Sequence, residues 1–138
     1  MVDGRSELAE ALARLSLFAD LTEPELASVA HGAEEELFEE GRRILREGLT
    51  GSALYVVLEG EVVVRLGGSE LARLGRGEFF GEMSVLLGMP PMADVVAASL
   101  VRCLVVPGPD VEKFLIERPR VMYRMLQAEA RRLRAAEL

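Results

Sequence analysis

A short segment near residue 80 carries the residues best suited to bind a ligand. Two phenylalanines are followed by Gly81 and then by Glu82, Met83 and Ser84. A glycine lets the backbone approach a ligand closely because it has no Cβ, and the amides of a helix that begins after it attract anions. Strand-rich stretches lie on both sides, where a plain turn would be enough to join two strands. The segment therefore indicates a binding loop.

Enzyme chemistry has few candidate residues in this chain. His31 is the only histidine and Cys103 the only cysteine. A zinc site needs several nitrogen or sulfur ligands, and a nucleophile needs a nearby base. Carboxylate sites for magnesium or calcium remain possible. Enzymes of the cupin type, whose fold is a β-roll, need a histidine-rich metal motif, which this chain lacks. Cys103 lies in the apolar run 101–106, which predicts a strand with a small buried residue. We therefore expect no enzyme, no metal site and no cofactor.

The chain that must position this segment divides into three parts. Residues 1–34 predict helices, because Thr22 and Glu25 form a capping box and Gly32 follows at a suitable distance to end the helix. Residues 35–106 hold short β-rich runs separated by glycines, which predicts a sandwich or barrel of strands. The loops are too short for parallel crossovers, so we expect antiparallel strands.

The third part, residues 107–138, is again helical. Pro109 and Asp110 open one segment, and a second helix begins near Pro119 and runs to the end of the chain. Its apolar residues recur in steps of three and four and form one stripe; they are Met122, Met125, Leu126, Ala130 and Leu133. Such a stripe packs either on its own domain or on a second copy. A homodimer through this helix is therefore one of two expectations.

Composition limits the location and the partners. A length of 138 residues suits a single domain, and a formal net charge of -7 argues against binding nucleic acid through a basic face. No apolar run is long enough to span a membrane, and the first residues lack the features of a signal peptide. We expect one cytoplasmic domain over residues 1–138 that by itself binds neither DNA nor a membrane.

The whole pattern resembles the cyclic-nucleotide-binding domain family, which includes the catabolite activator protein and the regulatory subunit of cAMP-dependent protein kinase. Residues 79–95 resemble the phosphate-binding cassette of that family. Residues 44–62, with Gly51 among their glycines, resemble its opening strands, and residues 117–119 with the helix that follows resemble its C-terminal helix. The resemblance implies a mainly β fold, a jelly-roll-like antiparallel β-roll with helices on both sides and a cassette over residues 80–95.

The resemblance also implies a ligand site for cAMP or cGMP. Glu82 matches the glutamate that accepts a hydrogen bond from the ribose hydroxyl, and Pro91 falls where the family usually has the arginine that holds the cyclic phosphate. Asp94 falls near a position where serine or threonine is common. The residues expected to form the site are Phe80, Gly81, Glu82, Met83, Ser84, Pro91, Met92 and Ala93.

The cassette thus keeps its sugar half and departs in its phosphate half. A guanidinium holds phosphate through paired, charge-assisted hydrogen bonds, worth roughly 1.5–3 kcal/mol, so its loss weakens binding on the order of ten- to a hundredfold. Asp94 would repel the phosphate further if its carboxylate points into the roll. The apolar residues of the cassette helix are expected in the core; they are Met83, Val85, Leu86 and Leu87.

Two functions stay open at this point. The first is a regulatory sensor domain that binds a cyclic or related nucleotide through an altered phosphate site. The second is a degenerate domain that has kept the fold without nucleotide binding and serves in dimerisation or partner docking. Pro91 and Asp94 favour the second function, whereas Glu82 favours the first.

Overall fold

The computed structural model describes residues 4–49 and 52–137 of the chain. Gly51, which we expected among the fixed glycines of the opening strands, lies outside the described residues. The contacts divide the chain into two compact units, residues 33–111 and residues 1–32 together with 112–138. Within the described ranges, no helix combines the length and the apolar character needed to cross a membrane.

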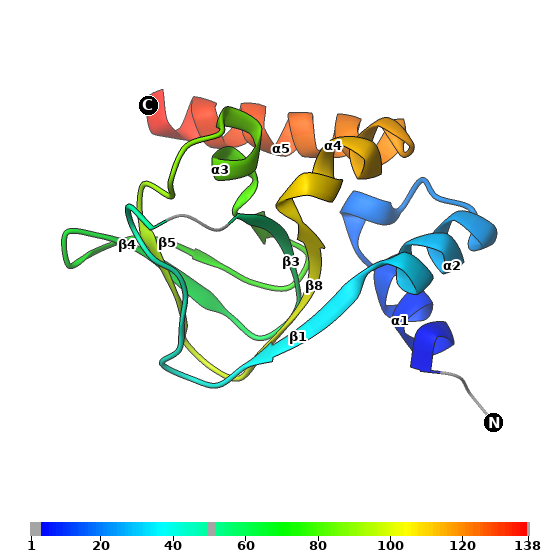
Figure 1. Cartoon of the computed structure of the whole chain (residues 1–138), viewed down its shortest axis with the longest axis horizontal. Coiled ribbons are helices and arrows are strands. Elements are labelled where there is room, and N and C mark those ends of the chain that lie inside the picture. The colour runs from blue at the N-terminus through cyan, green and yellow to red at the C-terminus, as the bar shows by residue number, and fades with distance from the viewer. Residues whose placement is uncertain (1–3, 50–51, 138) are drawn as a thin grey trace. The chain divides into compact units, whose positions relative to one another are not determined.

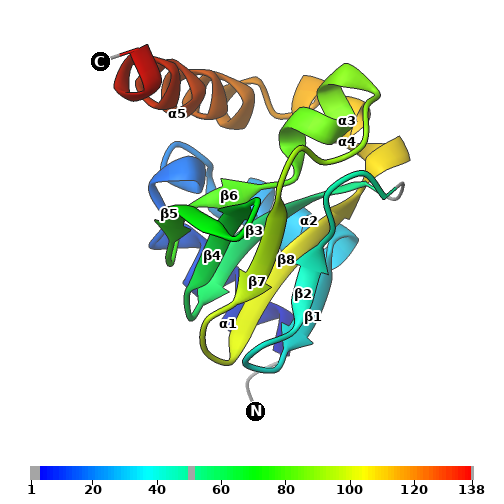
Figure 2. The ribbon, with the colours of Figure 1, turned by 90° about the vertical axis from the view of Figure 1, so that its left-hand side faces the viewer.

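Residues 33–111 form an antiparallel β-roll of two four-stranded sheets (Figures 1 and 2), with the strand orders β1-β8-β3-β6 and β2-β7-β4-β5. Every ladder is antiparallel, which confirms the prediction. The strands are β1 (Glu34–Phe38), β2 (Arg43–Leu45), β3 (Ala53–Glu59), β4 (Val62–Leu66), β5 (Ser69–Leu74), β6 (Phe79–Phe80), β7 (Asp94–Ala97) and β8 (Val101–Pro107). A helix, α3 (Glu82–Leu87), lies between β6 and β7, so the predicted short helix within the roll is confirmed.

The core of the roll lies between the two sheets and follows the two-residue alternation of its strands. On β7 the inward side chains are Val95 and Ala97, and they pair with Val64 and Val62 of β4. Cys103 on β8 is fully buried in the same core, as predicted from its apolar run. This alternation also fixes which residues of β7 point away from the core.

The second unit is helical. It contains α1 (Gly4–Ala13), a 3₁₀ turn η1 (Ser16–Phe18), α2 (Glu23–Gly32) and α5 (Pro119–Glu137). The helix α4 (Gly108–Ile116) begins in the roll unit and ends in this one. The predicted capping box of α2 is present, because the Thr22 N–H donates to Glu25 Oε1 at 2.9 Å and the Glu25 N–H donates to Thr22 Oγ1 at 3.4 Å.

The apolar residues of α5 do not form the single stripe that we predicted. Met125 is buried together with Val121, whereas Met122, Leu126 and Leu133 are exposed. The reason is that the apolar sector of α5 is wide: Val121 and Met125 lie along one edge of it, which is covered, and the exposed residues lie further round the helix. The exposed edge is the part of α5 that stays available for a second copy.

The start of α5 is tied to the segment between η1 and α2. Asp20 accepts hydrogen bonds from Arg124 Nε at 2.8 Å and from Arg120 at 3.1 Å. These bonds, the one from Arg124 above all, lower the pKa of the Asp20 carboxyl from 3.8 to about 2. The carboxylate form of Asp20 therefore holds two parts of the helical unit together that lie about a hundred residues apart in the sequence.

Candidate ligand-binding site

Gly81 starts the cassette helix at one end of the roll. Its φ is +86°, in the left-handed region that favours glycine. A Cβ at this position would lie 2.3 Å from the carbonyl oxygen of Ala53 and 3.2 Å from the Tyr55 ring. Only glycine lets β6 turn into α3 this close to β3, and the close approach of the Gly81 backbone to a ligand stays a prediction.

The helix α3 buries its polar residues and exposes its apolar ones. Glu82 is 4% exposed and Ser84 is 8% exposed, whereas Met83, Leu86 and Leu87 are each more than half exposed. The prediction that Met83, Leu86 and Leu87 lie in the core is therefore wrong, and Val85, expected there too, is only half-buried. Glu82 and Ser84 are the two residues of this six-residue helix that are buried.

A helix that buries a glutamate and exposes its leucines lowers the stability of the fold, so we look for a function of the buried glutamate. Burying a carboxylate costs several kcal/mol before its partners are counted, and leaving leucines in water forgoes the gain from burying them. A helix that served only to join β6 to β7 would have the opposite pattern. The buried Glu82 is thus the strongest indication within this unit that the segment binds a ligand.

Ser84 closes the loop that follows α3. Its hydroxyl donates a hydrogen bond to the carbonyl oxygen of Met89, and the Met89 N–H donates to the Ser84 carbonyl at 3.2 Å. Gly88, with φ +65°, ends the helix between them. The Ser84 side chain therefore has a structural role, and its hydroxyl oxygen keeps the capacity to accept a further hydrogen bond.

Phe80, the first residue expected in the site, has its ring in the core. It stacks on Tyr55 with ring centroids 4.9 Å apart, and Tyr55 meets Phe38 edge-on at 6.1 Å. Burial in this cluster raises the pKa of Tyr55. The aromatic cluster anchors the strand that delivers Gly81, and a ligand contact by Phe80 stays a prediction.

The tail of the cassette is tied to the loop after β2. The carbonyl oxygen of Pro91 accepts a hydrogen bond from the Gly48 N–H at 2.9 Å, and Asp94 Oδ1 accepts one from the Glu47 N–H at 2.8 Å. Asp94 also lies 3.7 Å from Nε of Arg43. Pro91 and Asp94, the two positions compared above with the phosphate half of the family's cassette, thus hold the end of the cassette against the loop at residues 47–48.

The carboxylate of Asp94 points away from the interior of the roll. Val95 and Ala97 face the core, so Asp94 lies on the opposite face of β7, with Arg65 opposite it on β4. The expected repulsion of a bound phosphate by Asp94 required the inward orientation and is therefore wrong. The remaining tail residues of the predicted site, Pro91 and Ala93, are half-buried, and Met92 is 70% exposed.

Four arginines are candidates to reach a phosphate in place of position 91, namely Arg65, Arg73, Arg76 and Arg102, and two of them pair with carboxylates. Arg73 pairs with Glu61 at 2.7 Å and with Glu70 at 3.0 Å. Arg102 hydrogen-bonds Glu59 and lies 3.9 Å from Glu35. From Met83 to Ala93 the chain has no charged residue at all.

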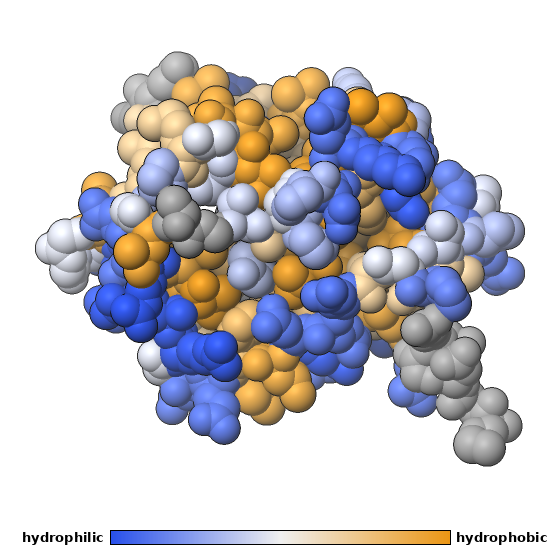
Figure 3. Space-filling model, in the orientation of Figure 1, coloured by the Kyte–Doolittle hydropathy of each residue, from blue (hydrophilic) through white to orange (hydrophobic). Residues whose placement is uncertain are grey.

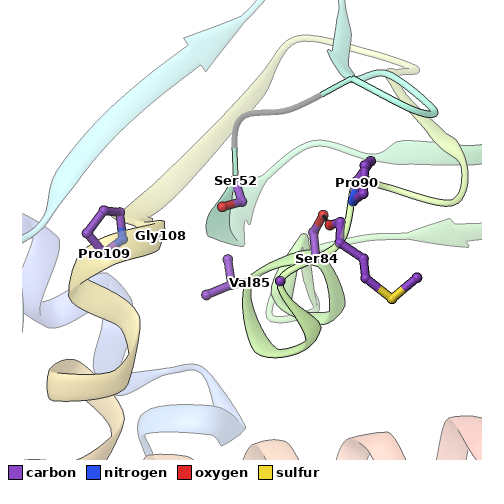
Figure 4. Close-up of a pocket in the computed structure, with 8 residues that line it drawn as sticks. Ser52, Ser84, Val85, Pro90, Gly108 and Pro109 are labelled. Atoms are coloured by element: carbon purple, nitrogen blue, oxygen red, sulfur yellow. Dashed lines mark hydrogen bonds between the residues drawn. The ribbon is translucent and has the colours of Figure 1, made fainter.

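A cavity of about 350 Å³ lies beside the cassette, between α3 and the joint of β8 with α4 (Figure 4). Ser84 and Val85 line it from α3, Pro90 from the loop after α3, and Ser52 and Gly108 from the ends of β3 and β8. Its lining is uncharged, and it shares Ser84 but not Glu82 with the predicted site. Sequence reasoning did not find Ser52 or Gly108, which meet only through the β3–β8 pairing.

A second hollow lies at the other end of the roll, where the β1–β2 and β7–β8 turns meet. Its lining combines two exposed leucines, Leu37 and Leu100, with Glu39, Glu40 and Arg42. Figure 3 shows apolar side chains bordered by hydrophilic ones at this lower end of the roll. Because the cassette lies at the opposite end (Figures 1 and 2), this hollow is separate from the predicted site.

The chain is thus a two-sheet antiparallel roll that carries a glycine-initiated helix with a buried glutamate between two of its strands. The model of the cyclic nucleotide-binding domain matches residues 35–118, and the chain belongs to this family.

Three similar proteins show the range of the family. A protein of Rhodopseudomonas palustris whose name assigns it to the potassium channels is 33% identical over 119 residues, which are 84% of this chain and 29% of that protein. The catabolite activator protein of Thermus thermophilus is 35% identical, with a TM-score of 0.76 over 88% of this chain and 59% of that one.

The third is the regulatory subunit of a cAMP-independent protein kinase A from Trypanosoma brucei, solved as a triple mutant with cAMP in its A site. It is 26% identical, with a TM-score of 0.67 over 90% of this chain and 51% of that one, and one of its three substitutions introduces an arginine. This chain spans less than a third of the length of the Rhodopseudomonas relative.

Proposed function

We propose that this chain is a regulatory sensor domain in which the sugar half of the nucleotide site is kept and the phosphate half is altered. The observation that carries the proposal is that the cassette has a buried glutamate at its start but no positively charged residue after it. Glu82 is buried at the start of α3, at the position where the family's glutamate accepts a ribose hydroxyl. The eleven residues from Met83 to Ala93 supply no cation for a phosphate. Such a domain binds and transmits, without catalysis of its own.

The expected consequence is weak binding of cAMP and cGMP. Charge-assisted hydrogen bonds to a phosphate are each worth roughly 1.5–3 kcal/mol, so the missing guanidinium weakens binding about ten- to a hundredfold. Arg73 and Arg102 do not make up the difference, because surface carboxylates hold both of them.

Calorimetric titration of cAMP and cGMP into the native chain, Pro91→Arg and Pro91→Ala tests the proposal. We expect Pro91→Arg to bind cAMP at least tenfold more tightly than either of the other two. Pro91→Ala is the matched control, because it frees the backbone amide and relaxes φ without adding charge. All three keep the carbonyl that accepts the Gly48 N–H. Tight binding of cAMP by the native chain would refute the altered phosphate site.

If the Asp94 carboxylate pointed into the roll, Asp94→Thr would raise cAMP affinity together with Pro91→Arg. The outward orientation of Asp94 changes this expectation, since its carboxylate caps the Glu47 N–H on the outer face. We now expect Asp94→Thr to leave cAMP affinity unchanged and to lower the free energy of unfolding by about 1 kcal/mol, the value of one hydrogen bond.

The second candidate function is a domain that docks or dimerises without binding a nucleotide. The ties of Pro91 and Asp94 to the 47–48 loop favour it, as does the exposed apolar edge of α5 at Met122, Leu126 and Leu133. Failure of both the native chain and Pro91→Arg to bind cAMP would select this function over the first.

A further inference from the structure

The turn hollow, which lies where the β1–β2 and β7–β8 turns meet, has a volume of about 580 Å³ and combines apolar with acidic side chains. Leu37 near the end of β1 is 63% exposed, and Leu100 in the β7–β8 turn is 61% exposed. Single exposed leucines are common on protein surfaces, whereas apolar side chains that gather in one place with a polar border indicate a contact site. Here both leucines line the same hollow, and Glu39, Glu40 and Arg42 border it.

The two turns that form the hollow are held in place by their neighbours in the roll. The Gly41 N–H donates to the carbonyl oxygen of Ala97 at 2.8 Å, and the Ala97 N–H donates to the carbonyl oxygen of Arg42 at 2.9 Å, which ties the β1–β2 turn to the end of β7. The carbonyl oxygen of Leu100 packs so closely on Gly60 that a Cβ at residue 60 would lie 2.2 Å from it. Because the turns are already ordered, a partner that binds them pays little conformational entropy on this side of the contact.

The border of the turn hollow is negatively charged. Residues 34–42 contain five glutamates and one arginine, Arg42, and the guanidinium of Arg42 lies over the Phe38 ring, 5.4 Å from its centroid. Glu39 and Glu40 form no ion pair with any residue that the structure describes. Their carboxylates are therefore available to a partner of opposite charge, and complementary charges speed association and exclude wrong partners.

We propose that the turn hollow is a docking site for a basic segment of a partner protein. An apolar side chain of that segment packs against the two leucines, and its arginines or lysines lie at Glu39 and Glu40. A second copy of this chain is disfavoured, because a two-fold contact through this face would bring two acidic borders together. The site lies away from the cassette, so the proposal does not depend on nucleotide binding.

The test is a fluorescence anisotropy titration of the native chain with three labelled peptides of equal length. The first is a run of arginines interrupted by two leucines, the second has serines in place of the leucines, and the third has glutamates in place of the arginines. We expect the first peptide to bind about tenfold more tightly than the second, which is the effect of burying one leucine side chain. The third peptide should not bind, and raising the salt concentration should weaken the binding of the first, because exposed charges are screened.

Two pairs of variants show whether the leucine peptide binds at the turn hollow. Leu100→Ser should weaken its binding about tenfold, whereas Leu71→Ser, which removes a leucine of β5 that is 59% exposed, should leave the binding unchanged. Glu39→Gln should weaken it about two- to fivefold, the effect of one exposed ion pair. Glu112→Gln removes the same charge from α4 and should have no effect. Circular dichroism melting of each variant shows whether it is folded before it is titrated.

Three results would overturn the proposal. Equal binding of the leucine and serine peptides would mean that the acidic border attracts any polycation. Equal effects of Leu100→Ser and Leu71→Ser would mean that the peptide does not bind at the turn hollow. If sedimentation velocity of the chain alone shows an oligomer that Leu100→Ser dissociates, a second copy occupies the hollow in place of a basic partner.

Discussion

The close approach of Gly81 to β3 can be tested by adding a single methyl group. In Gly81→Ala, the new Cβ would lie 2.3 Å from the Ala53 carbonyl oxygen, a backbone atom of a strand that pairs on both sides. A left-handed φ costs an L-residue about 1–2 kcal/mol, and overpacking costs about 1–3 kcal/mol more. We expect the free energy of unfolding to fall by roughly 2–5 kcal/mol in total.

Gly88→Ala is the matched control at the other end of the same helix. Its φ is +65°, so the backbone strain is similar, but nothing lies within 4 Å of its Cβ. The expected loss is the strain alone, about 1–2 kcal/mol. Any gain from the lower chain entropy of the unfolded alanine variants applies to both and cancels in their difference.

Urea unfolding followed by circular dichroism measures both losses. The two variants should share the m-value of the native chain and differ in midpoint, with Gly81→Ala the less stable by about 1–3 kcal/mol, the overpacking alone. Equal losses would mean that β6, α3 and β3 do not meet as closely as described, and the argument that glycine is required there would fall.

Three further predictions concern other parts of the chain. Since the Arg124 hydrogen bond keeps the pKa of Asp20 at about 2, its stabilising carboxylate is fully present above pH 3.8 and is lost as the pH falls through about 2. Thermal melting of Asp20→Asn from pH 5 to 2 should therefore show a smaller pH dependence than the native chain. Burial raises the pKa of Cys103 to about 12, so its alkylation at pH 8 should be on the order of a thousandfold slower than in urea; equal rates would contradict its burial. If α5 supports a dimer, sedimentation velocity should show a dimer that Leu126→Lys abolishes and Ile116→Lys does not, and a native monomer at high concentration would exclude it.

Much of the fold could be predicted because its signals are local. The capping box of Thr22 and Glu25 needs only a spacing of three residues, and it is present as predicted. The strands around 54–58 and 62–66 follow from β-rich runs between glycines, which matches β3 and β4. The antiparallel arrangement follows from loop length. These features do not depend on which distant residues meet.

The predictions were wrong in short elements, where the length is too small for the sequence to show which side of the helix or strand is buried. Six residues of α3 hold too few turns for a helical period to show which side is covered, so apolar residues were assigned to the core by their type alone. Asp94 precedes two valines in a row, and a two-residue period does not reveal which of Val95 and Val96 faces inward. The β4–β7 pairing settles it, because Val95 meets Val64 in the core.

Other features depend on contacts between distant parts of the chain. The Gly48 N–H donates a hydrogen bond to the Pro91 carbonyl, and Gly108 lies against Ser52. Neither contact can be predicted from the residues next to it in the sequence. A Cβ on Gly108 would lie 2.7 Å from the Ser52 hydroxyl, yet the sequence around Gly108 reads as an ordinary helix start. The uncharged cavity beside α3 therefore could not be predicted from the sequence.

The fold of this chain and its ligand chemistry depend on different residues, which explains why one is easily recognised and the other is not. The roll is held by inward side chains such as Val95 and Ala97, and these remain apolar. Pro91 and Asp94, which differ from the residues usual in the family, form hydrogen bonds between two loops, so these positions can change without a void or a buried charge in the core. A phosphate-binding arginine can thus be lost while the roll, the glycine turn and the buried glutamate all stay in place. Ligand binding by such a domain then depends on the few residues that the fold does not constrain, which is why titration of Pro91 variants, and not further likeness in fold, decides it.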